Sequence, residues 1–212
     1  PLDQKYLPSY NAKRYFKKYN KLKNALAIVN VQKDETIRDI DYIESVIYEL
    51  DNAKSIDDLE AIYDEISENS LFSDKLKVKS SSKKSSNKKA KPMTKNKLTS
   101  FNPLKYVIDG YTVLVGRNNK ENDYLTCKFA NKNDIWFHTK DIHGSHVILK
   151  TNPNEIVPDD VLFEVAKLAA KHSKAKNSSH VPVDFCKVSF VKKPSGSKPG
   201  YVIYSNNKTL YV

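Results

Sequence analysis

The sequence is poor in cysteine, glycine and long apolar runs, and each shortage excludes a class of protein. Its 212 residues include two cysteines, Cys127 and Cys186, which are too few for a disulfide scaffold or a four-cysteine zinc site. We interpret both as reduced, packed thiols of a cytosolic protein. Only five glycines are present, which excludes collagen-like chains and glycine-rich loops. No window approaches the ~18 consecutive apolar residues of a membrane-spanning helix, so we expect no membrane partner.

The start of the chain, Pro1-Leu2-Asp3, has none of the features of a secretory signal peptide, and the only methionine is Met93. We therefore interpret the chain as a piece excised from a longer cytoplasmic protein. Any function that it has is then part of a larger one.

Charge is distributed in blocks, although the chain as a whole has a formal net charge of +11. Residues 1–74 contain ten Lys or Arg and fifteen Asp or Glu, residues 75–103 contain ten lysines and no acid, and residues 104–212 contain sixteen bases and ten acids. The first block is itself bipolar, because its 1–33 portion has eight bases and one acid whereas 34–74 has two bases and fourteen acids. These boundaries predict a helical arm, a flexible Lys/Ser-rich linker and a C-terminal domain.

The arm has the sequence pattern of a long helix, because residues 9–91 contain neither proline nor glycine. Apolar residues over 15–50 follow the four-three alternation of a coiled-coil seam, which predicts one helix from about Ser9 to Asn52 with Ser9 as its N-cap. A lone helix cannot bury so narrow a seam, so we expect a partner strand or a homodimer through the arm. A second, short amphipathic helix is predicted over 57–68.

The Lys/Ser tract of the linker has almost no apolar residue to bury, which predicts disorder. Two interpretations stay open for it. It is either a solvated tether or a polycation that binds phosphates by releasing their counterions, and one segment can do both.

The C-terminal domain is predicted to have an α+β fold, with a mainly antiparallel sheet and helices covering one face. One helix begins at Pro158 and ends in the cationic segment 171–176, and a shorter helix is expected over 121–130. The last two strands form a predicted hairpin, since the two asparagines between them tolerate positive φ. The predicted strands are 106–115, 134–138, 146–149, 187–191, 201–204 and 209–212.

The segment 133–149 contains the only tryptophan and three of the five histidines. Strand alternation places Asp134, Trp136 and His138 on one face and the two apolar residues between them on the core face. The polar-aromatic face is suited to stacking on a base or a ribose while Lys140 binds a phosphate. Trp136 as a core residue remains the alternative.

The same segment contains residue types that bind metals or catalyse reactions. The spacing of His138, His143 and His146 resembles that of a zinc site. Strand alternation, however, does not bring the three side chains together, and Gly144 predicts a turn between His143 and His146. Ser145 and His146 are not expected to act as a nucleophile and its base, because the side chains of adjacent residues in an extended chain point apart. We expect no metal, no cofactor and no catalysis, and a tight turn whose amides and hydroxyl bind backbone or phosphate.

Cations near turns complete the predicted RNA-binding surface, on a domain with more bases than acids. The basic residues of 13–23 are either a solvated helix face or a second stretch that lies along RNA. The predicted RNA-binding residues of the domain are Arg117, Asn118, Lys128, Asp134, Trp136, His138, Lys140, His143, Ser145, His146, Lys192, Lys193 and Lys198.

Six motifs occur in order along the chain, at 11–23, 115–118, 121–126, 134–138, 144–147 and 191–200. Together they resemble the C-terminal half of the NFACT family. Residues 1 to about 70 are similar to the returning strand of the coiled-coil arm of that family, and 101–212 are similar to its NFACT-R, or RNA-binding, domain. The resemblance implies that the NFACT-N domain, the helix-hairpin-helix domain and the outgoing strand are absent.

The resemblance implies a role in ribosome-associated quality control. Members of the family bind the large ribosomal subunit obstructed by peptidyl-tRNA and help to recruit alanyl-tRNA, so that the stalled chain acquires an alanine tail. The ribosome performs peptide transfer, so a non-enzymatic fragment is expected, with the large subunit, tRNA, rRNA and ribosomal proteins as partners. The alternative is a protein-binding module or adhesin, because some bacterial members have a fibronectin-binding label.

Overall fold

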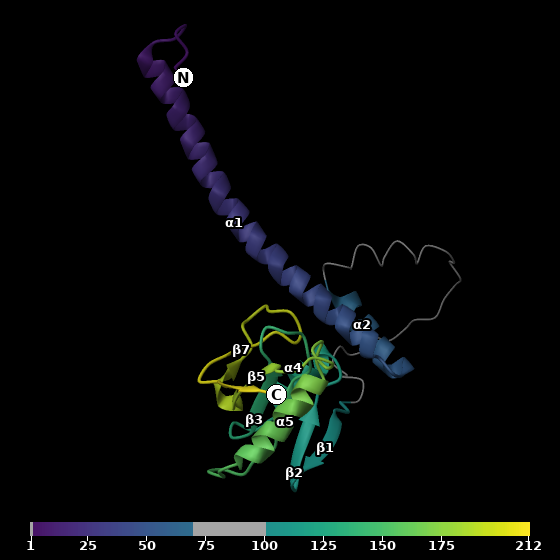
Figure 1. The fold of residues 1–212 in the computed structure, drawn as a ribbon. Helices are drawn as coiled ribbons and strands as arrows, with labels where there is room; N and C mark the ends of the chain where they lie inside the picture. The colour runs from purple at the N-terminus through teal and green to yellow at the C-terminus, as the bar shows by residue number, and fades with distance from the viewer. Residues whose placement is uncertain (1, 70–100) are drawn as a thin grey trace, which may run out of the picture. The chain divides into compact units, whose positions relative to one another are not determined.

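The computed structural model of the chain describes residues 2–69 and 101–212 (Figure 1). The chain divides into two compact units, Pro1–Ile43 and Glu44–Val212. This boundary lies inside the long helix, so the end of that helix is grouped with the C-terminal domain. The predicted disorder of the Lys/Ser tract falls on 75–100, outside the described residues. No helix in the described ranges has the length and apolar character needed to cross a bilayer.

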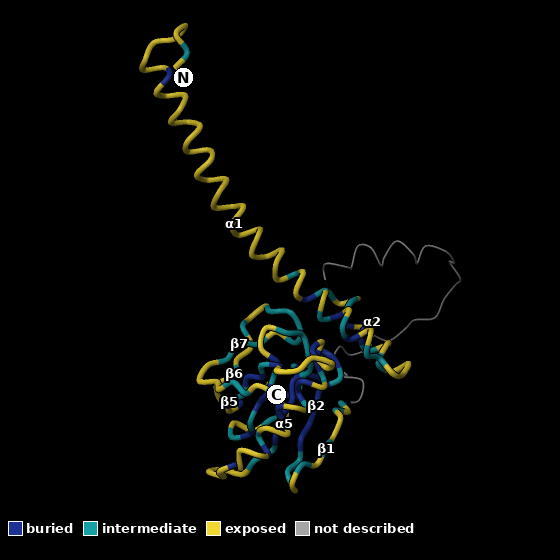
Figure 2. Tube along the Cα trace, in the orientation of Figure 1, coloured by how far each residue is buried: buried dark blue, intermediate teal, exposed yellow. Residues whose placement is uncertain are grey.

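The long helix α1 spans Pro8–Asn52 without interruption, which confirms the prediction of a single long helix. Ser9 is not its N-cap, because the helix already includes Ser9 and the Tyr10 N–H donates to the Leu7 carbonyl at 3.0 Å. Most apolar side chains of the seam over 15–50 are exposed (Figure 2). Pairing of the seam with another helix therefore stays a prediction.

The second helix, α2 (Ile56–Glu68), confirms the predicted short amphipathic helix. A capping box begins it: the Ser55 side chain accepts a hydrogen bond from the Asp58 N–H, and the Asp58 carboxylate accepts one from the Ser55 N–H. Its buried residues are Ile62 and Glu65, so one face packs inward and the acidic remainder lies at the surface.

The C-terminal domain is built on a six-stranded sheet in which every neighbouring pair is antiparallel. The strand order is β1-β2-β4-β3-β5-β8, and a separate two-stranded sheet pairs β6 with β7. With its helices, this sheet confirms the α+β class. The strands are β1 (Leu104–Ile108), β2 (Tyr111–Val115), β3 (Ile135–Thr139), β4 (Val147–Leu149), β5 (Pro182–Lys187), β6 (Val191–Lys192), β7 (Ile203–Tyr204) and β8 (Lys208–Tyr211).

The predicted C-terminal hairpin is wrong, because its two strands join different sheets. β7 pairs with β6, whereas β8 pairs with β5. The positive φ of Asn206 confirms a turn between them, but the chain crosses from one layer to the other there. Tyr204 packs against the Trp136 side of the main sheet and Leu210 against the opposite side. The predicted strand 187–191 is also interrupted, by a 3-10 turn at Val188–Phe190.

Both faces of the main sheet are covered, in contrast to the prediction of helices over one face. Helix α5 (Asp159–Lys171) packs its apolar stripe on the face that includes Phe137. The helix predicted over 121–130 is present as α4 (Asn119–Tyr124) followed by a π-helical turn, η2 (Leu125–Phe129), and Leu125 of this turn packs on the face that includes Trp136. The domain is therefore a three-layer structure with two hydrophobic cores.

Candidate nucleic-acid interface

Trp136 lies in the second core, so its predicted role as a stacking platform for RNA is wrong. Its side chain is 0% exposed. The indole stacks on the His138 ring at a centroid distance of 5.7 Å and meets the edge of the His146 ring at 5.4 Å. Strand alternation was predicted correctly for β3, but a second layer covers the face that was expected to bind bases.

Asp134 is also buried, and its carboxylate has a structural role instead of a place on an RNA surface. It accepts hydrogen bonds from the backbone N–H groups of Asn131 at 2.7 Å and Thr151 at 3.1 Å, and it pairs with the Lys150 ammonium. These contacts join the segment before β3 to the segment after β4. A buried carboxylate with these partners is not part of a surface that binds phosphates.

His138 and His146, whose rings contact the Trp136 indole, are neutral at physiological pH. Burial lowers the pKa of His138 to about 4 and that of His146 to about 3. His146 Nδ1 lies 2.8 Å from the Thr126 hydroxyl oxygen, and His138 Nε2 lies 3.3 Å from the Gly144 carbonyl oxygen. Within the described part of the chain, no three His, Cys, Asp or Glu side chains are placed to hold a metal ion.

These lowered pKa values predict a loss of stability in mild acid. An unfolded histidine binds a proton below its ordinary pKa of about 6.5, whereas the folded chain keeps both rings neutral until about 4 or below. The free energy of unfolding should therefore fall as the pH drops from 7, by about 2 kcal/mol per histidine at pH 5. Urea unfolding against pH measures this. Titration of either ring near pH 6.5 in the folded chain, seen by NMR, would contradict it.

The turn after β3 separates the predicted residues Lys140, His143 and Ser145. Lys140 is exposed. His143 Nε2 lies 3.1 Å from a carboxylate oxygen of Glu44, and the Ser145 N–H donates to the His172 carbonyl at 2.9 Å. The predicted turn is present, but its Ser145 amide binds backbone, so Lys140 is the member of this group that faces solvent.

Arg117 and Asn118 contact other residues of the protein, and of the two only Asn118 is buried. The Asn118 side chain caps α4 by accepting a hydrogen bond from the Glu121 N–H at 2.8 Å. The Arg117 guanidinium lies between two carboxylates, 2.9 Å from Glu121 and 3.1 Å from Asp58 of α2. Arg117 thus holds α2 to the C-terminal domain.

Asn119, which was not selected from the sequence, continues this contact. Its side-chain amide donates to the Ser45 hydroxyl oxygen at 3.0 Å and to a Glu65 carboxylate oxygen at 3.3 Å. Glu49 is buried nearby, and burial, followed by the charge of Glu65, raises its pKa well above the ordinary value. We call the contacts of Arg117 and Asn119 with residues 45–65 the clasp.

Three of the predicted residues that remain at the surface lie in the π-helical turn or in the segment that begins with β6. Lys128 and Lys192 are exposed, and Lys193 pairs with Asp123 of α4. The charges of Lys193 and Lys128 both act on the Cys127 thiol, so each lysine lies near that thiol. Lys198 instead contacts Asn69 after α2, at 3.1 Å.

Three further residues extend this surface, and none was selected from the sequence. Phe129 is 45% exposed, Lys132 is exposed, and the Lys150 ammonium lies 5.5 Å from the centroid of the Phe129 ring. The Ser189 N–H donates to the Lys132 carbonyl at 3.2 Å, which ties this loop to the segment before β6. We name the group the π-helix patch; its members are Lys128, Phe129, Lys132, Lys150, Lys192 and Lys193.

The cysteines differ from the prediction of two packed thiols. Cys186 is buried, but Cys127 is exposed on the π-helical turn. Partial burial still raises the pKa of the Cys127 thiol, so it is protonated at neutral pH and a poor nucleophile. The π-helix patch instead presents lysine ammonium groups and a phenyl ring.

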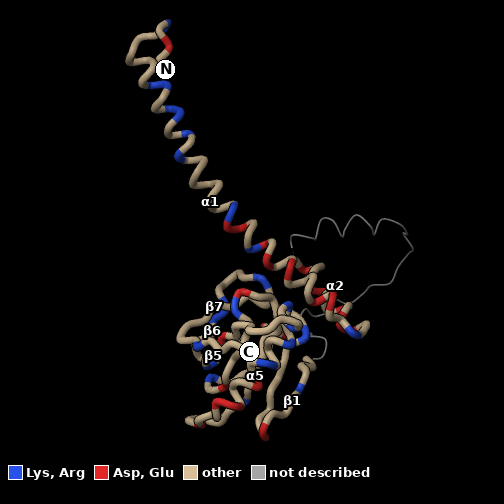
Figure 3. The backbone as a smooth tube through the Cα atoms, in the orientation of Figure 1, with Lys and Arg blue, Asp and Glu red and all other residues tan. Residues whose placement is uncertain are grey.

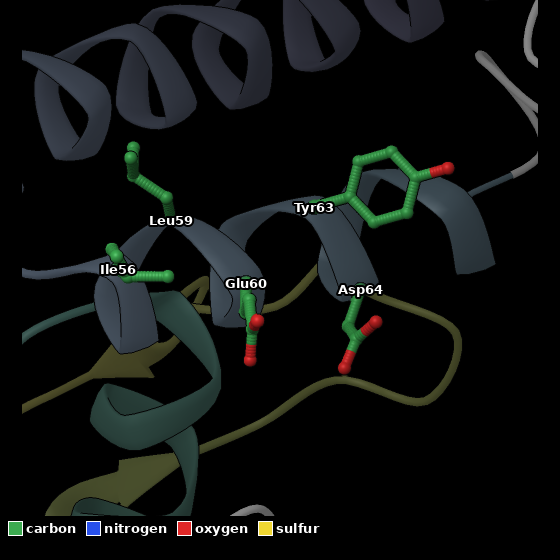
Figure 4. A pocket seen from close by; sticks show the side chains of 5 residues that line it. All are labelled: Ile56, Leu59, Glu60, Tyr63 and Asp64. Carbon is green, nitrogen blue, oxygen red and sulfur yellow. The ribbon is translucent and has the colours of Figure 1, made fainter.

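The outer face of α2 has the opposite charge. Ile56, Leu59 and Tyr63 line a shallow hollow together with Glu60 and Asp64 (Figure 4). In Figure 3, basic residues lie on the first half of α1, and acidic residues lie on the end of α1 and on α2. Carboxylates repel phosphates, so the acidic face of α2 is unsuited to binding a nucleic acid.

Two family models match the chain. The NFACT protein RNA binding domain matches residues 97–206, and the NFACT N-terminal and middle domains match residues 1–88. The first match contains β1 to β7 and the whole π-helix patch. The second contains α1 and α2.

Curated relatives align along the whole chain. The Rqc2 homolog RqcH of Bacillus subtilis (strain 168) is 40% identical over 216 residues, which are 100% of this chain and 34% of that protein. The Rqc2 homolog RqcH of Streptococcus suis (strain 05ZYH33) is 40% identical over 213 residues, which are 100% of this chain and 35% of that protein. The chain thus spans about a third of the length of these relatives.

A solved structure has the same fold. It is the C-terminal part of the fibronectin/fibrinogen-binding protein from Streptococcus suis, which superposes with a TM-score of 0.75 at 37% sequence identity and covers 97% of this chain and 76% of that chain. The family suggested by the motifs is confirmed by matches over both halves of the sequence. This chain belongs to the NFACT family and contains its RNA-binding domain.

Proposed function

We propose that this chain is the RNA-binding and ribosome-docking part of a cytoplasmic ribosome-associated quality control factor. In this role it binds rRNA and tRNA on the obstructed large subunit and supports alanine tailing of the stalled chain without catalysing a reaction itself. The match of the RNA-binding domain over residues 97–206 is the observation that carries the proposal. Relatives named as Rqc2 homologs, similar along the whole chain, support it.

The mechanism begins with electrostatic capture. Exposed lysines such as Lys128 and Lys192 neutralise RNA phosphates and release the counterions condensed around them. The clasp then keeps α2 and the RNA-binding domain together, so that RNA bound to the π-helix patch is held at a fixed position relative to α2. The contacts to phosphate give position, and the shape of the RNA gives selectivity.

Salt dependence tests the proposal directly. The chain is titrated into labelled tRNA or a large-subunit rRNA fragment, and the affinity should fall steeply between roughly 50 and 200 mM salt. Binding that is absent, or that does not respond to salt, would count against an RNA-binding role. In parallel, ribosome capture by the immobilised chain should be lost after nuclease treatment.

A protein-binding role is the second candidate, and the acidic, apolar hollow on α2 favours it. The Streptococcus suis protein whose C-terminal part has the same fold is named as fibronectin/fibrinogen-binding. An apolar stripe flanked by carboxylates fits a basic protein segment better than it fits RNA. Ribosome capture that survives nuclease treatment would favour this second role.

A further inference from the structure

Phe129 is a phenyl ring held at the surface among lysines. A single exposed phenylalanine is common and needs no explanation. This ring differs because a cation, the Lys150 ammonium, lies 5.5 Å from its centroid and a second ring, Phe101, lies 5.1 Å away. Phe101 is partly buried and packs against the second core, so Phe129 contacts a ring that the core holds in place. The 45% exposure of Phe129 leaves aromatic surface open to a ligand.

The backbone that presents Phe129 is unusual. The Ala130 N–H donates to the Leu125 carbonyl at 2.9 Å, which is the hydrogen bond of a π-helical turn. Such turns are rare and are found frequently at functional sites. Here the turn begins at the fully buried Leu125 and ends in three consecutive exposed residues, 127–129. One short segment thus combines an anchor in the core with a cation and an aromatic ring at the surface.

The charge around the ring is positive. Five lysines belong to the π-helix patch, and the two carboxylates beside them, Asp123 and Asp134, are each paired with one of these lysines. Lys128, Lys132 and Lys192 are exposed, and no carboxylate of the described residues forms an ion pair with them. The patch therefore attracts an anion while offering a π surface, a combination typical of sites that bind single-stranded nucleic acids.

We propose that the π-helix patch binds unpaired RNA, with one base stacked on Phe129 and the adjoining phosphates bound by Lys128, Lys132 and Lys192. This inference rests on the proposed function and names the form of RNA recognised. In a duplex the base faces are stacked on one another and cannot reach the ring. Every base has a π face, so binding should depend on strandedness and only weakly on sequence.

The experiment compares two labelled probes, an oligoadenylate and a blunt RNA duplex of the same length, titrated with the 212-residue chain and followed by fluorescence anisotropy. Phe129→Ala and Phe129→Leu should each weaken binding of the oligoadenylate about tenfold and leave duplex binding within about twofold. Phe129→Tyr retains the ring and should retain the affinity. The leucine variant preserves apolar bulk, so loss of folding cannot imitate its effect; circular dichroism verifies this.

Phe163 provides a matched control within the same domain. It is 37% exposed, and the Lys167 ammonium lies 4.7 Å from its ring, but it is on α5, away from the π-helical turn. Phe163→Ala should leave binding of both probes unchanged. If Phe129→Leu behaves like Phe163→Ala, or weakens duplex binding equally, the inference is wrong while the proposed function stands. If the unmodified chain binds neither probe, nor tRNA, the proposed function itself fails.

Discussion

Replacing Lys128, Lys132 and Lys192 together with alanine is expected to weaken binding of tRNA and rRNA between about tenfold and a hundredfold at low salt. All three side chains are exposed and belong to the π-helix patch. Each phosphate contact that is lost also removes one released counterion, so the slope of log affinity against log salt should become shallower by roughly 2. Titrations at several salt concentrations measure both quantities on the same protein.

The matched control removes the same net charge from other parts of the domain. Lys105 of β1, Lys171 of α5 and Lys208 of β8 are exposed and lie outside the π-helix patch. Their replacement by alanine should reduce affinity by no more than about threefold, through the long-range field alone. Equal losses in the two triple variants would show that total charge, and not the π-helix patch, determines RNA binding.

Much of the fold was predictable because it depends on local patterns. The uninterrupted run without proline or glycine predicted α1. The Pro and two acids before the apolar stripe of α5 predicted a start at Pro158, one residue before the observed start at Asp159. Strand alternation placed Trp136 and Phe137 on opposite faces correctly. Patterns of this kind show which side chains share a face.

The binding surface was less predictable, because a pattern does not show what covers a face. The layer over Trp136 is assembled from Leu125, Val188 and Tyr204, which are far apart in sequence. The alternation in β3 contained no sign of this layer, so the sequence left Trp136 open to both a platform and a core interpretation. Phe129 was missed for the converse reason, since a phenylalanine at the end of an amphipathic helix usually packs inward. The run Lys128-Phe129 beside Lys132 was the available signal.

A second large effect is expected at the clasp, in the double variant Arg117→Ala and Asn119→Ala. The free energy of unfolding of the unit Glu44–Val212 should fall by about 3–5 kcal/mol at neutral pH. The reason is that Glu121 and Glu65 are 5% and 2% exposed and would each lose a side-chain donor that helps to compensate their burial. Urea unfolding followed by tryptophan fluorescence measures the change, since Trp136 lies in the core.

Two single variants separate the clasp from general surface charge. Lys120→Ala removes an ion pair with Glu68, whose side chain is 74% exposed, and should change the free energy of unfolding by no more than about 0.5 kcal/mol.

Glu49→Gln should change the free energy of unfolding in the opposite direction to the double variant. Because the folded-state pKa of Glu49 is raised, its contribution to stability is complete in acid and is lost as the pH rises through that value. The glutamine should therefore stabilise the chain at neutral pH and leave its stability unchanged near pH 4.

If the double variant loses no more stability than Lys120→Ala, the clasp contributes little, and α2 would be free to separate from the RNA-binding domain.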